Sequence, residues 1–331
     1  MVRRYSDTST IRAIPPIRPG GRKPMNSDLK QARHDFLNYL RYNRGAAEST
    51  RTGYRSDVKI WHGWLDEAEH DWKICSYIEA EQFIAWQQRT GRRAHIIARR
   101  VSALTTFYRW AKRQHWTTVD PFYRVELPKR PHRLPVWLER EEQQRLEAIA
   151  AAPEALPPNL CGHTRDRIEF ARHRYAVLFA LLQNSGLRIS EALALKVGDV
   201  RVVEGQARSV RVIGKGDKER GVPLPLDFGQ ELGAWIDEHL GAGDHVFSKW
   251  PGEPPPNPRA VRDYLNRLVE QAGIDKPITP HKLRHTYATR LLESGAELVD
   301  IQALLGHANL ATTQIYTHVS DERMASVVAR L

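Results

Sequence analysis

The sequence contains little cysteine and no long apolar run, and each absence excludes a class of protein. Two cysteines, Cys75 and Cys161, are too few for a disulfide scaffold or a cysteine-rich zinc site. No run of about 18 apolar residues is present, so we expect no membrane-spanning helix. The basic, proline-rich start lacks the apolar core of a secretory signal, so we expect none. These features favour a globular protein of a reducing cytoplasm.

Charge is distributed unevenly along the 331 residues, which suffice for about two domains. The net charge of +11 comes from 50 lysines and arginines against 39 aspartates and glutamates. Residues 1–136 hold 26 basic and 13 acidic side chains (net +13), whereas residues 137–331 hold 24 and 26 (net −2). A basic part joined to a nearly neutral part suggests that the first part binds a polyanion; the alternative is a charge that only maintains solubility.

Proline content and helical periodicity divide the first part of the chain. Residues 1–26 are basic and rich in proline and glycine, which predicts a flexible arm. Residues 27–118 carry amphipathic helical patterns and are predicted to form a small all-α domain. Residues 119–136 combine proline with positive charge, which is typical of an extended linker. The helices are expected near residues 27–45, 49–65, 78–88 and 93–114.

The helix expected over residues 93–114 is strongly basic. Its apolar positions, among them Ile97, Val101 and Leu104, predict a buried stripe, and we expect the basic residues on its other side. Such a face can contact DNA phosphates; the alternative is an ordinary solvated surface. The candidate DNA-binding residues, one of them in the linker, are Arg92, Arg93, Arg99, Arg100, Lys112, Arg113 and Arg130.

Residues 137–331 are predicted to form a second domain, mainly α-helical with one small sheet. Short runs with a period of two, at 200–203, 209–213 and 221–224, predict three antiparallel strands. The polar stretch 153–164 is typical of a loop. Helices are expected near 139–151, 167–184, from about 189, and near 229–240, 258–272, 280–294, 298–305 and 311–319.

Several polar side chains of this second domain lie beside the expected ends of helices and strands. Arginine presents a planar fork that suits phosphate oxygens, and two arginines could neutralise the charge of a phosphoryl transition state. Histidine can move protons near neutral pH, lysine can protonate a leaving oxygen, and tyrosine can form an ester with phosphorus. The side chains of this set are Arg188, Lys215, His281, Arg284, His307 and Tyr316.

Four segments carry a resemblance to a known family. They are STRTGYRSDVKIWHGWL, SGLRISEALAL, VIGKGDKERGVPLP and TPHKLRHTYATRLLESGAELVDIQALLGHANLATTQIYTHVS. Over roughly residues 27–331 the chain resembles the tyrosine site-specific recombinases, especially their bacterial Xer-type branch. The resemblance implies a C-shaped, two-domain clamp on duplex DNA, with a SAM-like core-binding domain at 27–118 and a catalytic domain at 137–331. It also implies a homotetramer assembled on two sites, and strand exchange through a 3′-phosphotyrosine without metal, ATP or other cofactor.

The resemblance also assigns a role to each candidate residue. Tyr316 matches the nucleophile, and Lys215 matches the general acid for the 5′-hydroxyl leaving group. Arg188 matches the first catalytic arginine, and Glu191, one helical turn later, could orient it. The residues that match the His-x-x-Arg pair and the second histidine are His281, Arg284 and His307.

Three other interpretations compete with this one. His281 and His285 have the i, i+4 spacing of zinc-binding helices, but Lys282 stands where such helices carry a glutamate base. A type IB topoisomerase shares the nucleophile, arginines and lysine but acts alone, and a non-catalytic DNA-binding regulator could retain the fold. An apolar stripe that suits docking on a neighbouring protomer favours a recombinase, and it consists of Met324, Val327, Val328 and Leu331.

Overall fold

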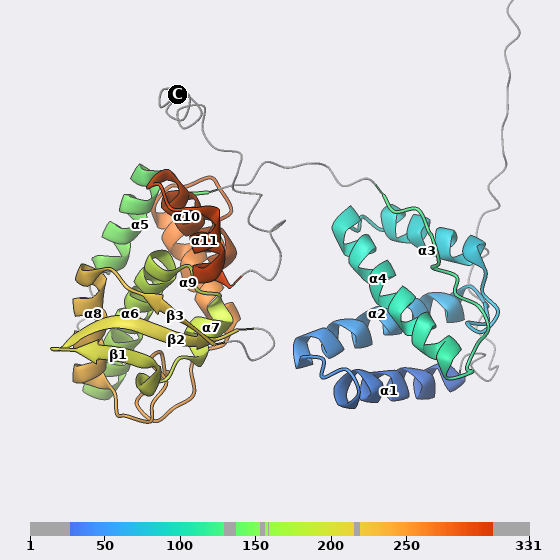
Figure 1. Ribbon diagram of the computed structural model, residues 1–331, viewed down its shortest axis with the longest axis horizontal. Helices are drawn as coiled ribbons and strands as arrows, with labels where there is room; N and C mark the ends of the chain where they lie inside the picture. The colour runs from blue at the N-terminus through green and yellow to red at the C-terminus, as the bar shows by residue number, and fades with distance from the viewer. Residues whose placement is uncertain (1–26, 129–136, 153–155, 158, 215–218, 307–331) are drawn as a thin grey trace, which may run out of the picture. The chain divides into compact units, whose positions relative to one another are not determined.

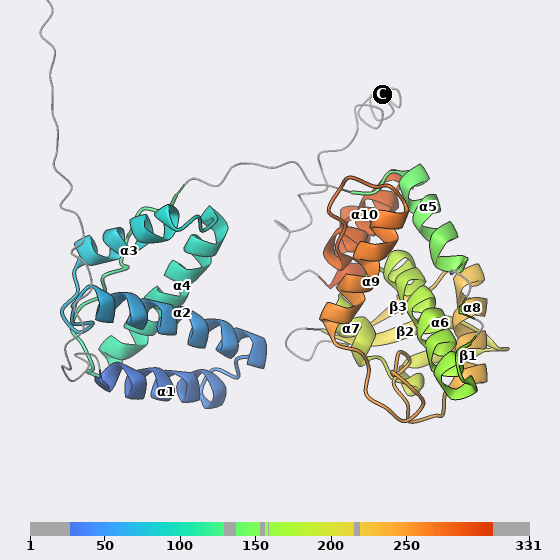
Figure 2. The same ribbon diagram turned by 180° about the vertical axis from the view of Figure 1, so that it is seen from behind.

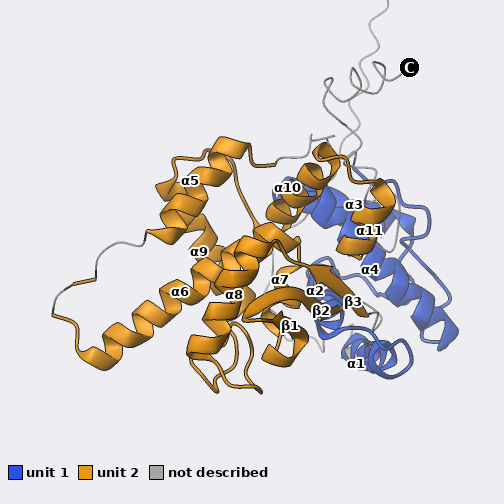
Figure 3. Ribbon diagram, turned by 60° about the vertical axis from the view of Figure 1, so that its left-hand side comes forward, with its two compact units in different colours: residues 1–133 blue, residues 134–331 orange. Residues whose placement is uncertain are grey.

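The chain divides into two compact units, Met1–Arg133 (unit 1) and Leu134–Leu331 (unit 2), shown in Figure 3. The computed structural model describes residues 27–128, 137–152, 156–157, 159–214 and 219–306. Some predicted features therefore lie outside the described residues, namely the arm 1–26, Arg130, Lys215, His307, Tyr316 and the apolar stripe near the C-terminus.

Over its described residues, unit 1 is a bundle of four helices, as the amphipathic patterns predict (Figure 1). The helices are α1 (Ser27–Tyr42), α2 (Glu48–Glu67), α3 (Tyr77–Arg89) and α4 (Ala94–Arg113). Helix α4 packs against α1, α2 and α3. Its predicted apolar stripe, including Ile97 and Leu104, is fully buried. The helical periodicity of the sequence thus predicts the buried side of α4 correctly.

Aromatic side chains fill the core of unit 1. Trp61 of α2 and Tyr108 of α4 are fully buried, and the indole N–H of Trp61 donates to the Tyr108 hydroxyl at 3.0 Å. The same hydroxyl donates to the carbonyl oxygen of Trp72 at 3.0 Å, so these buried polar groups have partners. Phe83 of α3 packs edge-on against Trp61, with ring centroids 4.9 Å apart. This packing fixes the helices that carry the basic residues.

The described part of unit 2 is mainly helical and contains one three-stranded antiparallel sheet, which confirms the predicted fold class. The order is β1-β2-β3, and Val210 lies opposite Val200 and Val222. None of the described helices in either unit is long and apolar enough to cross a membrane. The elements are α5 (Arg140–Ala151), α6 (Gly162–Ser185), α7 (Ile189–Ala194), β1 (Val200–Val203), β2 (Gln206–Ile213), β3 (Glu219–Pro223), α8 (Leu226–His239), α9 (Pro258–Gln271), α10 (Pro280–Glu293) and α11 (Leu298–Leu305).

Helix α8 packs on the sheet at very short range. A Cβ atom at Gly229 would overlap the carbonyl oxygen of Ala207, and a Cβ atom at Gly233 would overlap that of Gly205. Glycine at these two positions therefore lets the helix backbone touch the backbone of the β1–β2 hairpin. This close packing holds the sheet whose third strand contributes to the site below.

Helix α6 is the central element of unit 2 and packs against α5, α8, α9 and α10 (Figure 2). Its apolar residues Leu178 and Leu181 are fully buried. The helix begins at Gly162, so the predicted loop over 153–164 extends too far. Buried Arg174 anchors the middle of α6, because its guanidinium donates to the carbonyl oxygen of Lys249 at 2.8 Å. The helix ends beside Gly186, where the candidate site begins.

Candidate active site

The site is built around the turn that ends α6. Gly186 has a φ of 59°, in the left-handed region that favours glycine. A Cβ atom at this position would lie 2.9 Å from Leu305 Cδ2 and closer still to the ring of Tyr287. Glycine therefore reverses the chain and at the same time lets α10 and α11 approach the end of α6. Two residues later, the chain reaches Arg188.

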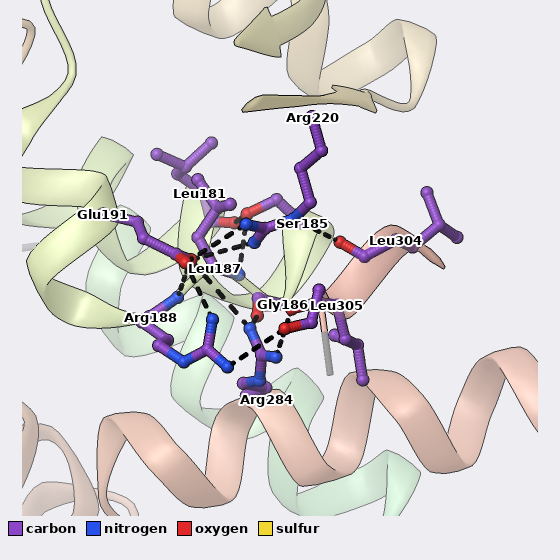
Figure 4. Close-up of polar contacts among 11 residues, drawn as sticks. Leu181, Ser185, Gly186, Leu187, Arg188, Glu191, Arg220, Arg284, Leu304 and Leu305 are labelled. Carbon is purple, nitrogen blue, oxygen red and sulfur yellow. Dashed lines mark hydrogen bonds and ion pairs between the residues drawn. The ribbon is translucent and has the colours of Figure 1, made fainter. Parts of the chain in front are cut away.

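Arg188 is the N-cap residue of α7, and Glu191 holds it there. The backbone N–H of Arg188 donates to Glu191 Oε2 at 2.9 Å, and its Nη1 donates to Oε1 at 2.8 Å (Figure 4). The structure thus confirms the contact that the spacing of these two residues predicts. The Arg188 side chain is 41% exposed, whereas that of Glu191 is 6% exposed. A buried carboxylate therefore orients an accessible cation.

Arg284 of α10 lies on the inner side of the same carboxylate. Its side chain is 2% exposed, and its Nη1 lies 4.0 Å from Glu191 Oε2. Nη1 donates to the carbonyl oxygen of Gly186 at 2.9 Å, and Nη2 donates to that of Leu305. Arg284 consequently links the ends of α6 and α11. The two predicted arginines, Arg188 and Arg284, meet at one glutamate although they are far apart in sequence.

His281 lies in the first turn of α10, which Thr279 caps. Its Nε2 lies 3.2 Å from His285 Nε2. Desolvation of the ring, together with the charges of Arg284 and Arg188, lowers the pKa of His281. The lowered pKa favours the neutral imidazole at pH 7, which can both donate and accept a hydrogen bond. Within the described segments, no group of three His, Cys, Asp or Glu side chains could hold a metal ion.

A third arginine, Arg220 of β3, enters the same cluster, and the predicted set did not include it. Its Nη2 donates to Glu191 Oε2 at 2.9 Å, and its Nε donates to the carbonyl oxygen of Leu304 at 2.8 Å. Burial acts to raise the pKa of Glu191, but hydrogen bonds from Arg220 and Arg188 outweigh it and hold that pKa below its usual value. Arg220 lies within the motif VIGKGDKERGVPLP, which marks the segment as part of the site. The partners of Arg220 are distant in sequence, so the motif alone does not show that this arginine belongs to the cluster.

The described cluster is suited to binding an oxyanion. Three guanidinium groups surround one carboxylate, which leaves two positive charges in excess. The accessible fork of Arg188 matches two oxygens of a phosphate, and a neutral His281 adds a hydrogen-bond donor or a proton acceptor. The structure thus brings Arg188, His281 and Arg284 together. The remaining predicted members, which lie outside the described residues, are Lys215, His307 and Tyr316.

Unit 1 carries most of the predicted DNA-binding residues on or just before α4. Arg99 is 54% exposed, and its Nη2 donates to Oδ1 of the fully buried Asp57 at 2.7 Å. As at Glu191, a buried carboxylate orients an accessible guanidinium. The predicted residues that the structure places on the surface are Arg92, Arg93, Arg99, Lys112 and Arg113.

Arg100, in contrast to the prediction, does not lie on this exposed face. Its side chain is 6% exposed, and its Nε donates to Asp57 Oδ1 at 3.3 Å. Arg100 follows Ile97 by three residues and precedes Leu104 by four, so helical geometry places it on the buried stripe of α4. Arg100 therefore supports the carboxylate that orients Arg99, and it is not available to DNA in this structure.

A second basic surface, which the sequence analysis missed, lies in a groove of about 340 Å³ between α1 and α2. The described residues that line it include no aspartate or glutamate. Those from α1 recur at intervals of three and four residues, so the polar face of this amphipathic helix contained the signal. The lining residues are Lys30, Arg33, His34, Leu37, Asn38, Arg41, Arg51 and Arg55.

Comparison with known proteins connects both units to one family. Residues 147–323 match the phage integrase family, and residues 34–115 match the phage integrase N-terminal SAM-like domain. The chain is similar to tyrosine recombinase XerD of Caulobacter vibrioides, with 37% identity over 314 residues, 88% of this chain and 93% of that protein. It is also similar to XerD of Halalkalibacterium halodurans, with 34% identity over 318 residues, 92% of this chain and 97% of that protein.

Two solved structures share the fold. One is the XerH site-specific recombinase bound to palindromic difH substrate, with a TM-score of 0.68 and 22% identity over 90% of this chain and 84% of that chain. The other is the Tn1549 transposon integrase in complex with transposon right end DNA, with a TM-score of 0.69 and 17% identity over 91% of this chain and 98% of that chain. At these identities the likeness concerns the fold.

Proposed function

The chain belongs to the phage integrase family, the tyrosine recombinases, and we propose that it recombines duplex DNA through a covalent bond between Tyr316 and a 3′-phosphate. Family membership makes it a site-specific enzyme that breaks and rejoins DNA. The observation that supports the proposed mechanism best is that Arg188 and Arg284 meet at one buried carboxylate, with His281 near enough for both charges to act on its ring. This arrangement provides the charge that a phosphoryl transition state requires.

The proposed first step replaces one phosphodiester by another. The phenolic oxygen of Tyr316 attacks the scissile phosphorus, the bond from phosphorus to the 5′ oxygen breaks, and Lys215 gives a proton to that oxygen. A neutral His281 can accept the phenolic proton. Rejoining runs this step in reverse with the 5′-hydroxyl of another strand. Because the phosphotyrosine conserves the bond that was broken, the cycle needs no ATP.

Arg188 and Arg284 are proposed to stabilise the negative charge that develops on the non-bridging oxygens. Arg188 is accessible and held by Glu191, so its fork is oriented before the phosphate arrives. Arg284 lies at the buried side of the same glutamate, where its hydrogen bonds to two backbone carbonyls fix its position. Since these cations supply the charge that Mg²⁺ supplies in other enzymes, we expect EDTA to leave formation of the covalent adduct unchanged.

We propose that the basic surface of unit 1 binds the DNA backbone, as the charge of residues 1–136 suggests. The XerH and Tn1549 integrase structures, which are DNA complexes, support DNA as the partner. The groove between α1 and α2 would add contacts to those of α4. The residues assigned to this surface are Arg92, Arg93, Arg99, Lys112 and Arg113, with Arg130 from the linker.

The domain assignment and the assembly are also proposals. We assign residues 1–26 to a basic arm, 27–118 to the core-binding domain, 119–136 to the linker and 137–331 to the catalytic domain. The boundary between the two compact units, after Arg133, falls inside this linker. We further propose a cytoplasmic homotetramer on two DNA sites, in which the apolar residues near the C-terminus dock on a neighbouring protomer.

The decisive experiment traps the covalent intermediate on a nicked duplex from which the cleaved 5′ fragment dissociates. Wild-type protein should form a protein–DNA adduct, and Tyr316→Phe should bind the same DNA but form none, because only the attacking oxygen is missing. A matched control is Tyr123→Phe, which changes a tyrosine of unit 1 that is 57% exposed. Adduct formation by Tyr316→Phe at the wild-type rate would overturn the nucleophile assignment.

Removal of residues 321–331 tests the proposed assembly. If the apolar stripe connects protomers, the truncated protein should bind a single site with nearly wild-type affinity but fail to bring two sites together or to recombine them. Binding, synapsis and recombination can be followed by gel-shift and product assays on the same DNA. Recombination at the full-length rate would show that these residues do not link protomers.

A further inference from the structure

The C-terminal end of α11 is bound by three arginines from separate segments of unit 2 (Figure 4). Arg220 of β3 donates to the carbonyl oxygen of Leu304 at 2.8 Å, and Arg284 of α10 donates to that of Leu305. Arg188, before α7, has its Nη2 3.5 Å from the carbonyl oxygen of Gly306. These are the carbonyl groups that a helix leaves unpaired at its C-terminus, where the helix dipole also attracts cations.

Arg220 differs from Arg188 because its side chain is only 13% exposed and all three of its nitrogens are engaged. Its two Nη atoms donate to both carboxylate oxygens of Glu191, at 3.2 and 2.9 Å. Its Nε donates to α11 from the same planar group. Arg220 is therefore largely inaccessible to a phosphate, whereas the 41% exposed Arg188 is accessible.

Gly306 shows how tightly this arrangement is packed. The residue ends α11 with a φ of 64°, in the left-handed region. A Cβ atom at this position would lie 3.1 Å from Nη1 of Arg220. Glycine thus lets the chain turn directly over the guanidinium before it continues to His307. The end of α11 and β3 are consequently joined through Arg220.

We propose that Arg220 is a positioning residue for DNA cleavage, which fixes Glu191 and the C-terminal end of α11 relative to β3. The inference rests on the proposed function, since it concerns the geometry of the same phosphate site. Arg220 shares the carboxylate oxygens with Arg188. Without Arg220, Glu191 and the end of α11 lose the arginine that joins both of them to β3, and the fork of Arg188 loses its defined orientation. A misplacement of about 1 Å at such a site can slow a reaction about 100-fold.

The test compares Arg220→Gln and Arg220→Lys with the wild type in single-turnover cleavage of the nicked duplex at saturating protein. We expect both variants to bind DNA within about 2-fold of the wild type and to cleave it between about 10- and 100-fold more slowly. Lysine keeps the charge but cannot hold a carboxylate with two nitrogens and a carbonyl with a third, so it should not restore the rate. Each rate is normalised to the folded fraction, obtained from the amplitude of active DNA binding.

The matched controls are Arg211→Gln and Arg211→Lys. Arg211 lies on the neighbouring strand β2, is 57% exposed and pairs with Asp199 at the surface at 2.9 Å. Its variants should cleave at the wild-type rate. Full-rate cleavage by Arg220→Lys would overturn the inference, as would a loss that merely follows the folded fraction. If the wild type forms no adduct, the proposed function fails, whereas wild-type adducts with unchanged Arg220 variants reject only the role of Arg220.

Discussion

Both units use one buried carboxylate to orient an arginine that remains accessible. In unit 1 the fully buried Asp57 binds Arg99, which is 54% exposed, and Arg100, which is 6% exposed. In unit 2 the 6% exposed Glu191 binds Arg188, which is 41% exposed, together with two more deeply buried arginines. The same device therefore occurs on a helical surface suited to DNA and in a cluster suited to a phosphoryl group.

The two clusters differ in what else their arginines bind. In the cluster around Asp57, Arg100 has another side chain as its second partner, because it donates to the amide oxygen of Gln87. In the cluster around Glu191, Arg220 and Arg284 instead donate to backbone carbonyls at the ends of α11 and α6. The first cluster consequently orients one surface cation within a helical bundle. The second fixes the relative positions of several elements, which is what a reacting site needs more than a binding surface does.

The largest effect is expected from removing the charge of Asp57. Asp57→Asn leaves the buried Arg100 without an anionic partner, so we expect the free energy of unfolding of unit 1 to fall by about 3–5 kcal/mol. Urea unfolding followed by tryptophan fluorescence measures this change. The control is Glu48→Gln, which breaks the ion pair between Arg51 and the 66% exposed Glu48. This variant should lower the free energy of unfolding by less than about 1 kcal/mol. Equal losses in the two variants would contradict the role given to Asp57.

The second effect separates cleavage from binding. Arg188→Ala should lower the single-turnover cleavage rate by about 100- to 1,000-fold, roughly 3–4 kcal/mol, because it removes a donor aimed at the transition-state charge. Its DNA affinity should change little, since the surface of unit 1 is intact. Arg99→Ala should do the opposite, weakening binding while leaving cleavage at saturating protein nearly unchanged. If Arg188→Ala cleaves normally once saturated, the proposed catalytic role of this arginine is wrong.

A smaller effect is expected on the salt dependence of DNA binding. Each phosphate contact contributes about 0.9 to the slope of log affinity against log salt concentration. Replacing Arg99 and Lys112 by glutamine should therefore reduce the slope by about 2, measured by fluorescence anisotropy across a salt series. Arg259→Gln, at an 87% exposed position of α9, is the control and should leave the slope unchanged. An unchanged slope in the double variant would identify α4 as a solvated face.

The smallest effect concerns the protonation of His281. Because the charges of Arg284 and Arg188 add to desolvation in lowering its pKa below 6.5, Arg188→Met should raise that pKa by removing one neighbouring cation. NMR titration of the imidazole Cε1–H signal follows the change, with Arg211→Met as a control because Arg211 is not among the cations that lower this pKa. In the wild type, the His281 ring should become protonated only as the pH falls below the usual pKa of histidine. A decrease of the pKa in Arg188→Met would contradict the geometry described above.

Local sequence patterns were sufficient to locate most of the elements and much of the site. Apolar residues at helical spacing placed α2 and α4, alternating residues placed the three strands, and Thr279-Pro280 marked the start of α10. These signals work because helix caps and amphipathic faces depend on residues within a few positions of each other. The spacing of Arg188 and Glu191 predicted their contact for the same reason.

The boundary error at α6 and the wrong face predicted for Arg100 both arise from contacts between segments that are distant in sequence. Arg100 occupies a position of the apolar stripe, and periodicity alone would have placed it inside, but a buried arginine requires a carboxylate that the sequence does not point to. That carboxylate, Asp57, is 43 residues away on another helix. Likewise, α6 begins before its first apolar positions because contacts with distant segments hold its polar end, such as the 2.8 Å hydrogen bond from Arg167 to Glu253.

The sequence by itself determined the helices, the strands, the family and the order of the candidate catalytic residues. Only the tertiary structure decided that Arg220, 29 residues after Glu191 and 84 before Leu304, belongs to the same cluster as Arg188 and Arg284. The physical reason is range: caps and amphipathic stripes are read from neighbouring residues, whereas a shared carboxylate and the carbonyls at a helix end acquire their partners only when distant segments pack together.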